Sequence, residues 1–174
     1  MRNVLFAFLT LFSVPLFAFT FDAGQIEIPD GFEGPASKGM GNNMIVHAFT
    51  HPHSGADTSA LLQISIWNPG GTFPSMSGRQ LEEAATGYLM QFLSGVARAR
   101  RDFRHSDVEM LSISGRPVAK VMWQGAVDKG DAEGIMYCYL GRSQLVILHT
   151  QDLARFGGRY IDQAVQAFEA MELR

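Results

Sequence analysis

The stretch Leu145-Val146-Ile147-Leu148 places four large apolar residues in succession. Neighbouring side chains of a β-strand point to opposite faces of the sheet, so this strand would present apolar side chains on both faces. Such a strand is typical of the middle of a sheet that is covered on both sides. We therefore expect residues 143–150 to form a central strand between two helical layers.

Three further strands are predicted just before this segment, at residues 108–113, 117–124 and 133–140. The connections between the four strands are short and rich in turn-forming residues. They read Ser114-Gly115-Arg116-Pro117, Asp128-Lys129-Gly130-Asp131 and Gly141-Arg142. Strands joined by turns of this length run antiparallel, so the four strands should form a meander.

The N-terminal half predicts strands at residues 25–28, 43–50 and 60–67, from their alternating apolar residues and the turn residues around them. The Gly- and Pro-rich stretch 31–41 is interpreted as a loop. Because strands and helices do not alternate along the chain, a parallel doubly wound fold is disfavoured.

Two amphipathic helices are expected, one after the first group of strands and one at the C-terminus. The first spans about residues 77–101 and opens with Ser77 and Gln80, which have the spacing of a capping box. The second spans about residues 156–172, and its apolar stripe consists of Ile161, Ala164, Val165, Phe168 and Met171. The predicted fold class is therefore α+β, with an antiparallel sheet of about six to seven strands flanked by helices.

The N-terminus has the order of a secretory signal peptide. Arg2 precedes an apolar stretch from Val4 to Phe12, and the small residue Ala18 lies where cleavage is expected. The apolar part is shorter than the roughly 20 residues that a membrane-spanning helix needs. We expect residues 1–18 to be a leader that is removed, and residues 19–174 to form a single periplasmic or secreted domain. The alternative is a membrane anchor that is not cleaved.

The net charge argues against one class of partner, and the cysteine content excludes an internal disulfide as a source of stability. The net charge is −3 with no long run of either sign, which argues against a nucleic-acid partner. The one cysteine, Cys138, cannot form an internal disulfide, although export would permit one. Its apolar neighbours favour a buried packing role over a nucleophilic one.

Three short motifs resemble the Mog1/PsbP-like α/β/α sandwich family, which includes bacterial exported proteins of the DcrB type. They are Ile28-Pro29-Asp30-Gly31-Phe32, Ile113-Ser114-Gly115-Arg116-Pro117-Val118-Ala119 and the amphipathic helix that closes the chain. The resemblance implies a non-enzymatic envelope or accessory protein whose relatives bind other proteins. DcrB-type members are commonly lipid-anchored, and the absence of a cysteine near Ala18 departs from that pattern.

The segment His47-Ala48-Phe49-Thr50-His51-Pro52-His53 holds three of the five histidines. Imidazole is a good ligand for zinc or copper, so His47, His51 and His53 are candidate metal ligands. On an extended strand His51 and His53 face the same side about 7 Å apart, whereas His47 lies about 13 Å from His51. The alternative is a strand end with solvated histidines.

Other polar clusters have structural interpretations. No Gly-x-Ser-x-Gly elbow is present, and Glu82-Glu83 lies in the first turns of a helix, where acidic residues complement the dipole. Four arginines at the end of the predicted first helix could bind anions, but cations there also stabilise the negative end of the dipole: Arg98, Arg100, Arg101 and Arg104. The strand aromatics, which are core candidates or a binding face, are Trp67, Trp123, Tyr137 and Tyr139.

No stretch of the sequence carries a specific catalytic or cofactor-binding signature. The leading hypothesis is a periplasmic binding or accessory protein that contacts another envelope protein without catalysing a reaction. The alternative is a zinc- or copper-binding protein that uses His51 and His53, with or without His47. An exported hydrolase comes third.

Overall fold

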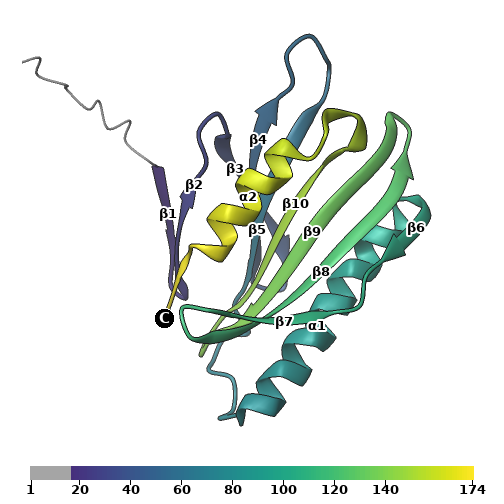
Figure 1. The fold of residues 1–174 in the computed structure, drawn as a ribbon. Coiled ribbons are helices and arrows are strands. Elements are labelled where there is room, and N and C mark those ends of the chain that lie inside the picture. Colours follow the sequence, from purple (N-terminus) through teal and green to yellow (C-terminus); the bar gives the residue numbers. More distant parts are fainter. Residues whose placement is uncertain (1–16) are drawn as a thin grey trace, which may run out of the picture.

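A computed structural model of the protein describes residues 17–174 and places an antiparallel eight-stranded sheet at its centre (Figure 1). The strand order is β3-β4-β5-β10-β9-β8-β6, and β7 pairs with another part of β8. The strands are β3 (Glu33–Gly41), β4 (Met44–Pro52), β5 (Ser59–Trp67), β6 (Arg101–His105), β7 (Glu109–Ile113), β8 (Arg116–Val127), β9 (Gly130–Leu140) and β10 (Leu145–Leu153). The antiparallel meander is confirmed, but the sheet is larger than the six to seven strands expected.

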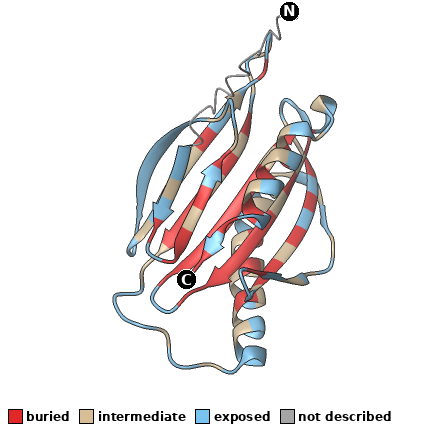
Figure 2. Cartoon of the chain, turned by 60° about the vertical axis from the view of Figure 1, so that its left-hand side comes forward, coloured by how far each residue is buried: buried red, intermediate tan, exposed pale blue. Residues whose placement is uncertain are grey.

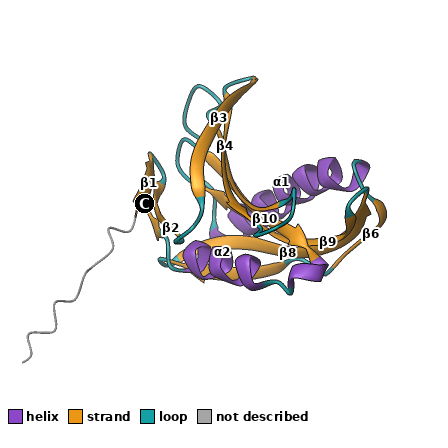
Figure 3. Cartoon of the chain, turned by 90° about the horizontal axis from the view of Figure 1, so that it is seen from above, coloured by secondary structure: helices purple, strands orange, loops and turns teal. Residues whose placement is uncertain are grey.

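β10 is the central strand that the sequence predicts, because it lies between β5 and β9. Leu145 and Ile147 belong to the core cluster under helix α1 (Gly78–Arg98). Val146 and Leu148 belong to the cluster under helix α2 (Arg159–Glu169). The two helices lie on opposite faces of the sheet (Figure 3). Each face of β10 therefore supports a separate half of the hydrophobic core.

Helix α1 begins with the expected capping box. The Ser77 side chain accepts a hydrogen bond from the Gln80 backbone N–H, and the Gln80 side chain accepts one from the Ser77 backbone N–H. The helix buries Ala85, Leu89 and Leu93 against the sheet. It ends at Arg98 rather than at residue 101, because the chain turns there and enters β6.

Helix α2 begins later than expected. A short 3-10 helix, η1 (Ala154–Phe156), is followed by Gly157 and Gly158, both with φ of 73°, a conformation that interrupts an α-helix and favours glycine. The predicted stripe is buried at Ile161, Ala164 and Phe168, with Val165 only half-buried. After the helix, Met171 is also buried, and the chain enters the short strand β11 (Glu172–Leu173).

The interpretation of residues 31–41 as a loop was wrong, because residues 33–41 form the edge strand β3. All nine residues of β3 are exposed, so the strand buries neither face and shows no apolar alternation (Figure 2). It is held by main-chain pairing with β4, interrupted by two register shifts. Pro35 is compatible with an edge position, where a missing N–H need not interrupt pairing.

A second, three-stranded sheet of order β1-β2-β11 packs over part of the α2 face. Its remaining strands are β1 (Phe17–Phe21) and β2 (Gly24–Ile28). The predicted leader lies outside the described residues except for Phe17 and Ala18, which pair with Ile28 and Glu27. A chain beginning at Phe19 would keep the other three pairs of this hairpin. Within residues 17–174 the structure contains no helix with the length and apolar character of a membrane span.

Candidate binding groove

The three candidate metal ligands lie on the same face of the sheet, but each has its own contacts. His47 shares a 2.8 Å hydrogen bond with Ser37, through its Nδ1, and its ring centre lies 4.8 Å from that of Phe19. Burial lowers the pKa of His47. His47 is thus tied to the small sheet and to β3.

His51 and His53 lie together around Tyr160 of α2. The ring of His51 stacks on Tyr160 at 4.0 Å, and that of His53 lies 5.3 Å from it. His53 also stacks on Phe156 at 3.6 Å, and its Nε2 lies 2.7 Å from Oδ1 of Asp152. In the described part of the chain no three His, Cys, Asp or Glu residues are arranged to hold a metal ion. Metal binding by His47, His51 and His53 stays a prediction.

Cys138 is buried among core residues under α1. Burial raises the pKa of its thiol to about 12, which keeps the thiol protonated at neutral pH. This environment agrees with the packing role expected from the sequence.

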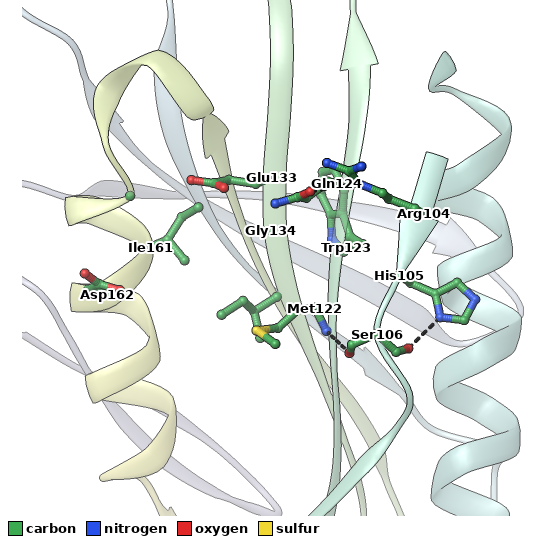
Figure 4. Close-up of a pocket in the computed structure, with 12 residues that line it drawn as sticks. Arg104, His105, Ser106, Met122, Trp123, Gln124, Glu133, Gly134, Ile161 and Asp162 are labelled. Atoms are coloured by element: carbon green, nitrogen blue, oxygen red, sulfur yellow. Dashed lines mark hydrogen bonds between the residues drawn. The ribbon is translucent and has the colours of Figure 1, made fainter. Parts of the chain in front are cut away.

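A groove of about 440 Å³ lies on the α2 face, between α2 and β6 (Figure 4). Its floor carries the side chains of Met122 and Ile135, from β8 and β9. Met122 is 53% exposed, so the floor of the groove offers an accessible apolar surface. Helix α2 packs mainly on β10, β2, β5 and β9. The neighbouring part of the sheet, towards β6, is left without a helix over it, and the groove lies there (Figure 4).

Ser106 fixes the wall of the groove that follows β6. Its backbone N–H donates to the Met122 carbonyl at 2.9 Å, and its Oγ accepts from the Met122 N–H at 3.2 Å (Figure 4). His105 is held in turn by a 2.7 Å contact between its Nδ1 and the Ser106 carbonyl. The segment between β6 and β7 is therefore hydrogen-bonded to β8 at Met122.

The two walls of the groove carry opposite charge. Glu133 and Asp162 line the side next to α2, and within residues 17–174 neither carboxylate forms an ion pair. Arg104 lines the opposite side, where its Nε donates to Oε1 of Gln124 at 2.9 Å. An apolar floor between walls of opposite charge is suited to a chain segment with an apolar side chain and flanking charges.

A polar contact joins α2 to β8 about two turns beyond Asp162. Glu169 accepts hydrogen bonds from Lys120 Nζ and from the Tyr137 hydroxyl, both at 2.8 Å. The bond from Lys120 lowers the pKa of Glu169, while burial and the bond to Glu169 raise the pKa of Tyr137. This contact holds the C-terminal half of α2 against the sheet.

Sequence reasoning did not identify the groove. Its residues come from β6, the β8–β9 hairpin and α2, with Ser106 and Gly158 beside them, and each residue taken alone is ordinary. One signal was present: Met122 alternates with Lys120 and Gln124 on the polar side of its predicted strand. An apolar residue among the polar positions of a strand marks an exposed apolar spot on that face.

Comparison with known proteins identifies the fold. No family model matches the sequence, and a search of curated proteins finds no match. The structure is similar to the PsbP protein CyanoP of Synechocystis sp. PCC 6803, with a TM-score of 0.63 and 11% identity over 91% of this chain and 92% of that one.

Two other solved structures are similar along most of their length. One is a Pseudomonas aeruginosa protein of unknown function, with a TM-score of 0.55 and 16% identity over 91% of this chain and 97% of that one. The other is LpqN of Mycobacterium tuberculosis, described as involved in cell envelope biogenesis, with a TM-score of 0.53 and 9% identity over 91% of this chain and 84% of that one. The chain therefore has the PsbP-like fold, which confirms the resemblance seen in its sequence.

Proposed function

We propose that the protein is an exported accessory protein of the cell envelope, and that it binds a segment of another envelope protein in the groove between α2 and β6. The observation that carries this proposal is the exposed Met122 on the floor of a groove with oppositely charged walls. The leader-like N-terminus supports export. The fold shared with LpqN, whose description places it in envelope biogenesis, is compatible with such a role.

The proposed occupant is an extended segment that places an apolar side chain over Met122 and Ile135. A basic residue of that segment would face Glu133 and Asp162, and an acidic one would face Arg104. Opposite charges on the walls give such a segment a preferred direction, because the reversed segment would place like charges together.

Export is tested by fractionating cells that produce the native chain and measuring the mass of the protein. The expected result is an envelope or periplasmic protein that begins at Phe19. Intact protein that begins at Met1 in the soluble cytosol would overturn the assignment to the envelope.

Groove binding is tested by placing a photo-reactive amino acid at position 122 and irradiating whole cells. Met40 is the matched control, because it is a methionine of β3 with a similar exposure, 58% against 53%. We expect a cross-linked adduct from position 122 that contains one defined envelope protein. It should be absent from position 40, and it should disappear when Asp162→Lys is added to the position-122 chain.

The same adduct from both positions would show that contact is not specific to the groove. An adduct that still forms with Asp162→Lys would contradict the proposed pairing of Asp162 with a basic residue of the partner. Contact between the partner and the apolar floor would still stand. Whichever adduct forms, mass spectrometry of its cross-linked peptide identifies the sequence that occupies the groove.

A further inference from the structure

Three of the four arginines that the sequence groups together line one pocket on the α1 side of the molecule. Arg98, Arg100 and Arg101 surround a pocket of about 420 Å³ where α1 ends, and we call it the arginine pocket. Arg104 does not join them, because it lies further along β6 and lines the groove on the other side of the sheet. The remaining lining residues are Ala99, Ala126, Val127 and Asp128.

Arg100 makes specific side-chain contacts at the C-terminal end of α1. One of its guanidinium nitrogens donates to the Val96 carbonyl at 2.7 Å, and another donates to Oε1 of Gln151. The guanidinium lies 4.2 Å from the centre of the Trp123 ring, within the range of a cation–π contact. The Arg100 guanidinium is therefore engaged within the protein, whereas Arg98, in the last turn of α1, and Arg101 are both exposed.

The positive charge of the arginine pocket is only partly balanced within the described chain. Across residues 17–174 no carboxylate oxygen lies within 4.0 Å of these three guanidinium groups. The buried Nε of Arg100 has no hydrogen-bond partner, and burial lowers the pKa of this arginine. Asp128 supplies one negative charge on the lining against three positive ones.

We propose that the arginine pocket binds a phosphate group that belongs to a larger molecule. Guanidinium groups match the geometry of phosphate oxygens and form strong charge-assisted hydrogen bonds with them. The pocket is far larger than a single phosphate needs, so part of its volume remains for the group that carries the phosphate. A lipid headgroup and a soluble phosphorylated compound share this chemistry.

Trp123 provides a direct readout, because its ring contacts Arg100. The chain has two tryptophans, so Trp67→Phe leaves Trp123 as the one emitter. Titration of this protein with inorganic phosphate is expected to change its fluorescence and to saturate. Arg98→Gln with Arg101→Gln should weaken binding by about tenfold or more, because the two exposed guanidinium groups of the arginine pocket are lost.

The matched control is Arg116→Gln with Arg142→Gln. It removes the same charge at the opposite end of the sheet, near the start of β8 and the end of β9. Binding that is lost only in the Arg98/Arg101 variant supports the arginine pocket. Equal loss in both variants would show a general charge effect and would overturn the proposal. Thermal unfolding of each variant confirms that it is folded.

Vesicles distinguish the source of the phosphate. A lipid headgroup is indicated if the protein binds phosphatidylglycerol vesicles but does not bind phosphatidylcholine vesicles. The Arg98/Arg101 variant should then bind neither kind of vesicle. Saturable binding of inorganic phosphate without retention on vesicles would indicate a soluble compound. If neither probe binds the unaltered arginine pocket, the proposal is wrong.

Discussion

Nε2 of His53 lies 2.7 Å from Oδ1 of Asp152, and both residues are almost fully buried, with 6% and 4% of their surface exposed. The contact joins the segment after β4 to the end of β10, two strands that are not neighbours in the sheet. The same Asp152 oxygen accepts a 2.7 Å hydrogen bond from the Leu153 N–H. A histidine considered from sequence as a metal ligand thus connects two parts of the core.

Loss of either member of this pair should destabilise the protein strongly. Asp152→Ala leaves a buried imidazole nitrogen without its hydrogen-bond partner, and we expect the free energy of unfolding to fall by about 1–3 kcal/mol. Urea unfolding followed by circular dichroism measures the change. Lys129→Ala is the control, because Lys129 pairs with Asp57 at the surface and its loss should matter little. An Asp152→Ala variant as stable as this control would show that the pair contributes nothing.

Stability should fall in acid partly because of His149. Burial, together with the nearby Arg100 charge, lowers the pKa of His149 from 6.5 to about 3. Since the unfolded chain binds this proton below about pH 6.5 and the folded chain does not, the stability present above pH 6.5 is lost as pH falls towards 3. The loss is about 1.4 kcal/mol per pH unit for this residue.

His149→Gln tests this origin, because glutamine does not titrate. The slope of unfolding free energy against pH between 6.5 and 4 should be shallower in the variant, whatever its stability at pH 7. His105→Gln, at an exposed position, is the control for replacing a histidine by glutamine. Identical slopes for His149→Gln and the parent protein would mean that His149 titrates normally in the folded state.

The capping box of α1 predicts a local stability effect. Ser77→Ala removes the oxygen that accepts the Gln80 N–H, and we expect a loss of about 1 kcal/mol in chemical unfolding. Ser94→Ala is the comparison within the same helix, where Ser94 donates only to the Met90 carbonyl one turn earlier. Alanine favours the helix interior, so Ser94→Ala should be neutral or slightly stabilising. The opposite order of the two variants would contradict the cap.

Gly134 of β9 should tolerate no side chain. A Cβ atom there would lie 2.4 Å from the Thr150 carbonyl oxygen and 2.6 Å from the Trp123 ring, and both neighbours are buried. Gly134→Ala should therefore cost about 1–3 kcal/mol or more through overpacking. Gly39→Ala on β3, where a Cβ meets nothing within 4 Å, serves as the control in the same thermal unfolding assay. Equal melting temperatures would show that β9 can shift to make room.

The sequence predicts the elements that bury a face and misses those that do not. β10 was predictable because Leu145 to Leu148 must be covered on both sides, and α1 because its stripe and its capping box agree. β3 has no buried residue and hence no apolar pattern. β6 was not predicted, and its arginines were grouped with the end of the preceding helix. β1 begins inside the predicted leader, where its apolar residues were assigned to export.

The candidate sites were likewise predictable from the sequence only in part. The histidines were visible because they cluster in sequence, but the partners of His53, namely Asp152 and Phe156, come from β10 and η1 and could not be inferred from spacing. The groove depends on where α2 stops covering the sheet, which is a tertiary property. Three of the four arginines grouped from the sequence line one pocket, but Arg104 lies on the other face of the sheet.

The exposed edge strand β3 has a consequence for how the protein behaves among other chains. An open row of main-chain donors and acceptors can recruit a foreign strand and start aggregation. β3 carries a proline without an N–H, the charged Lys38, and two breaks in register, all of which interrupt continuous pairing. In a crowded compartment these features would keep the molecule from joining neighbours edge to edge, so that recognition is left to side chains on its two faces.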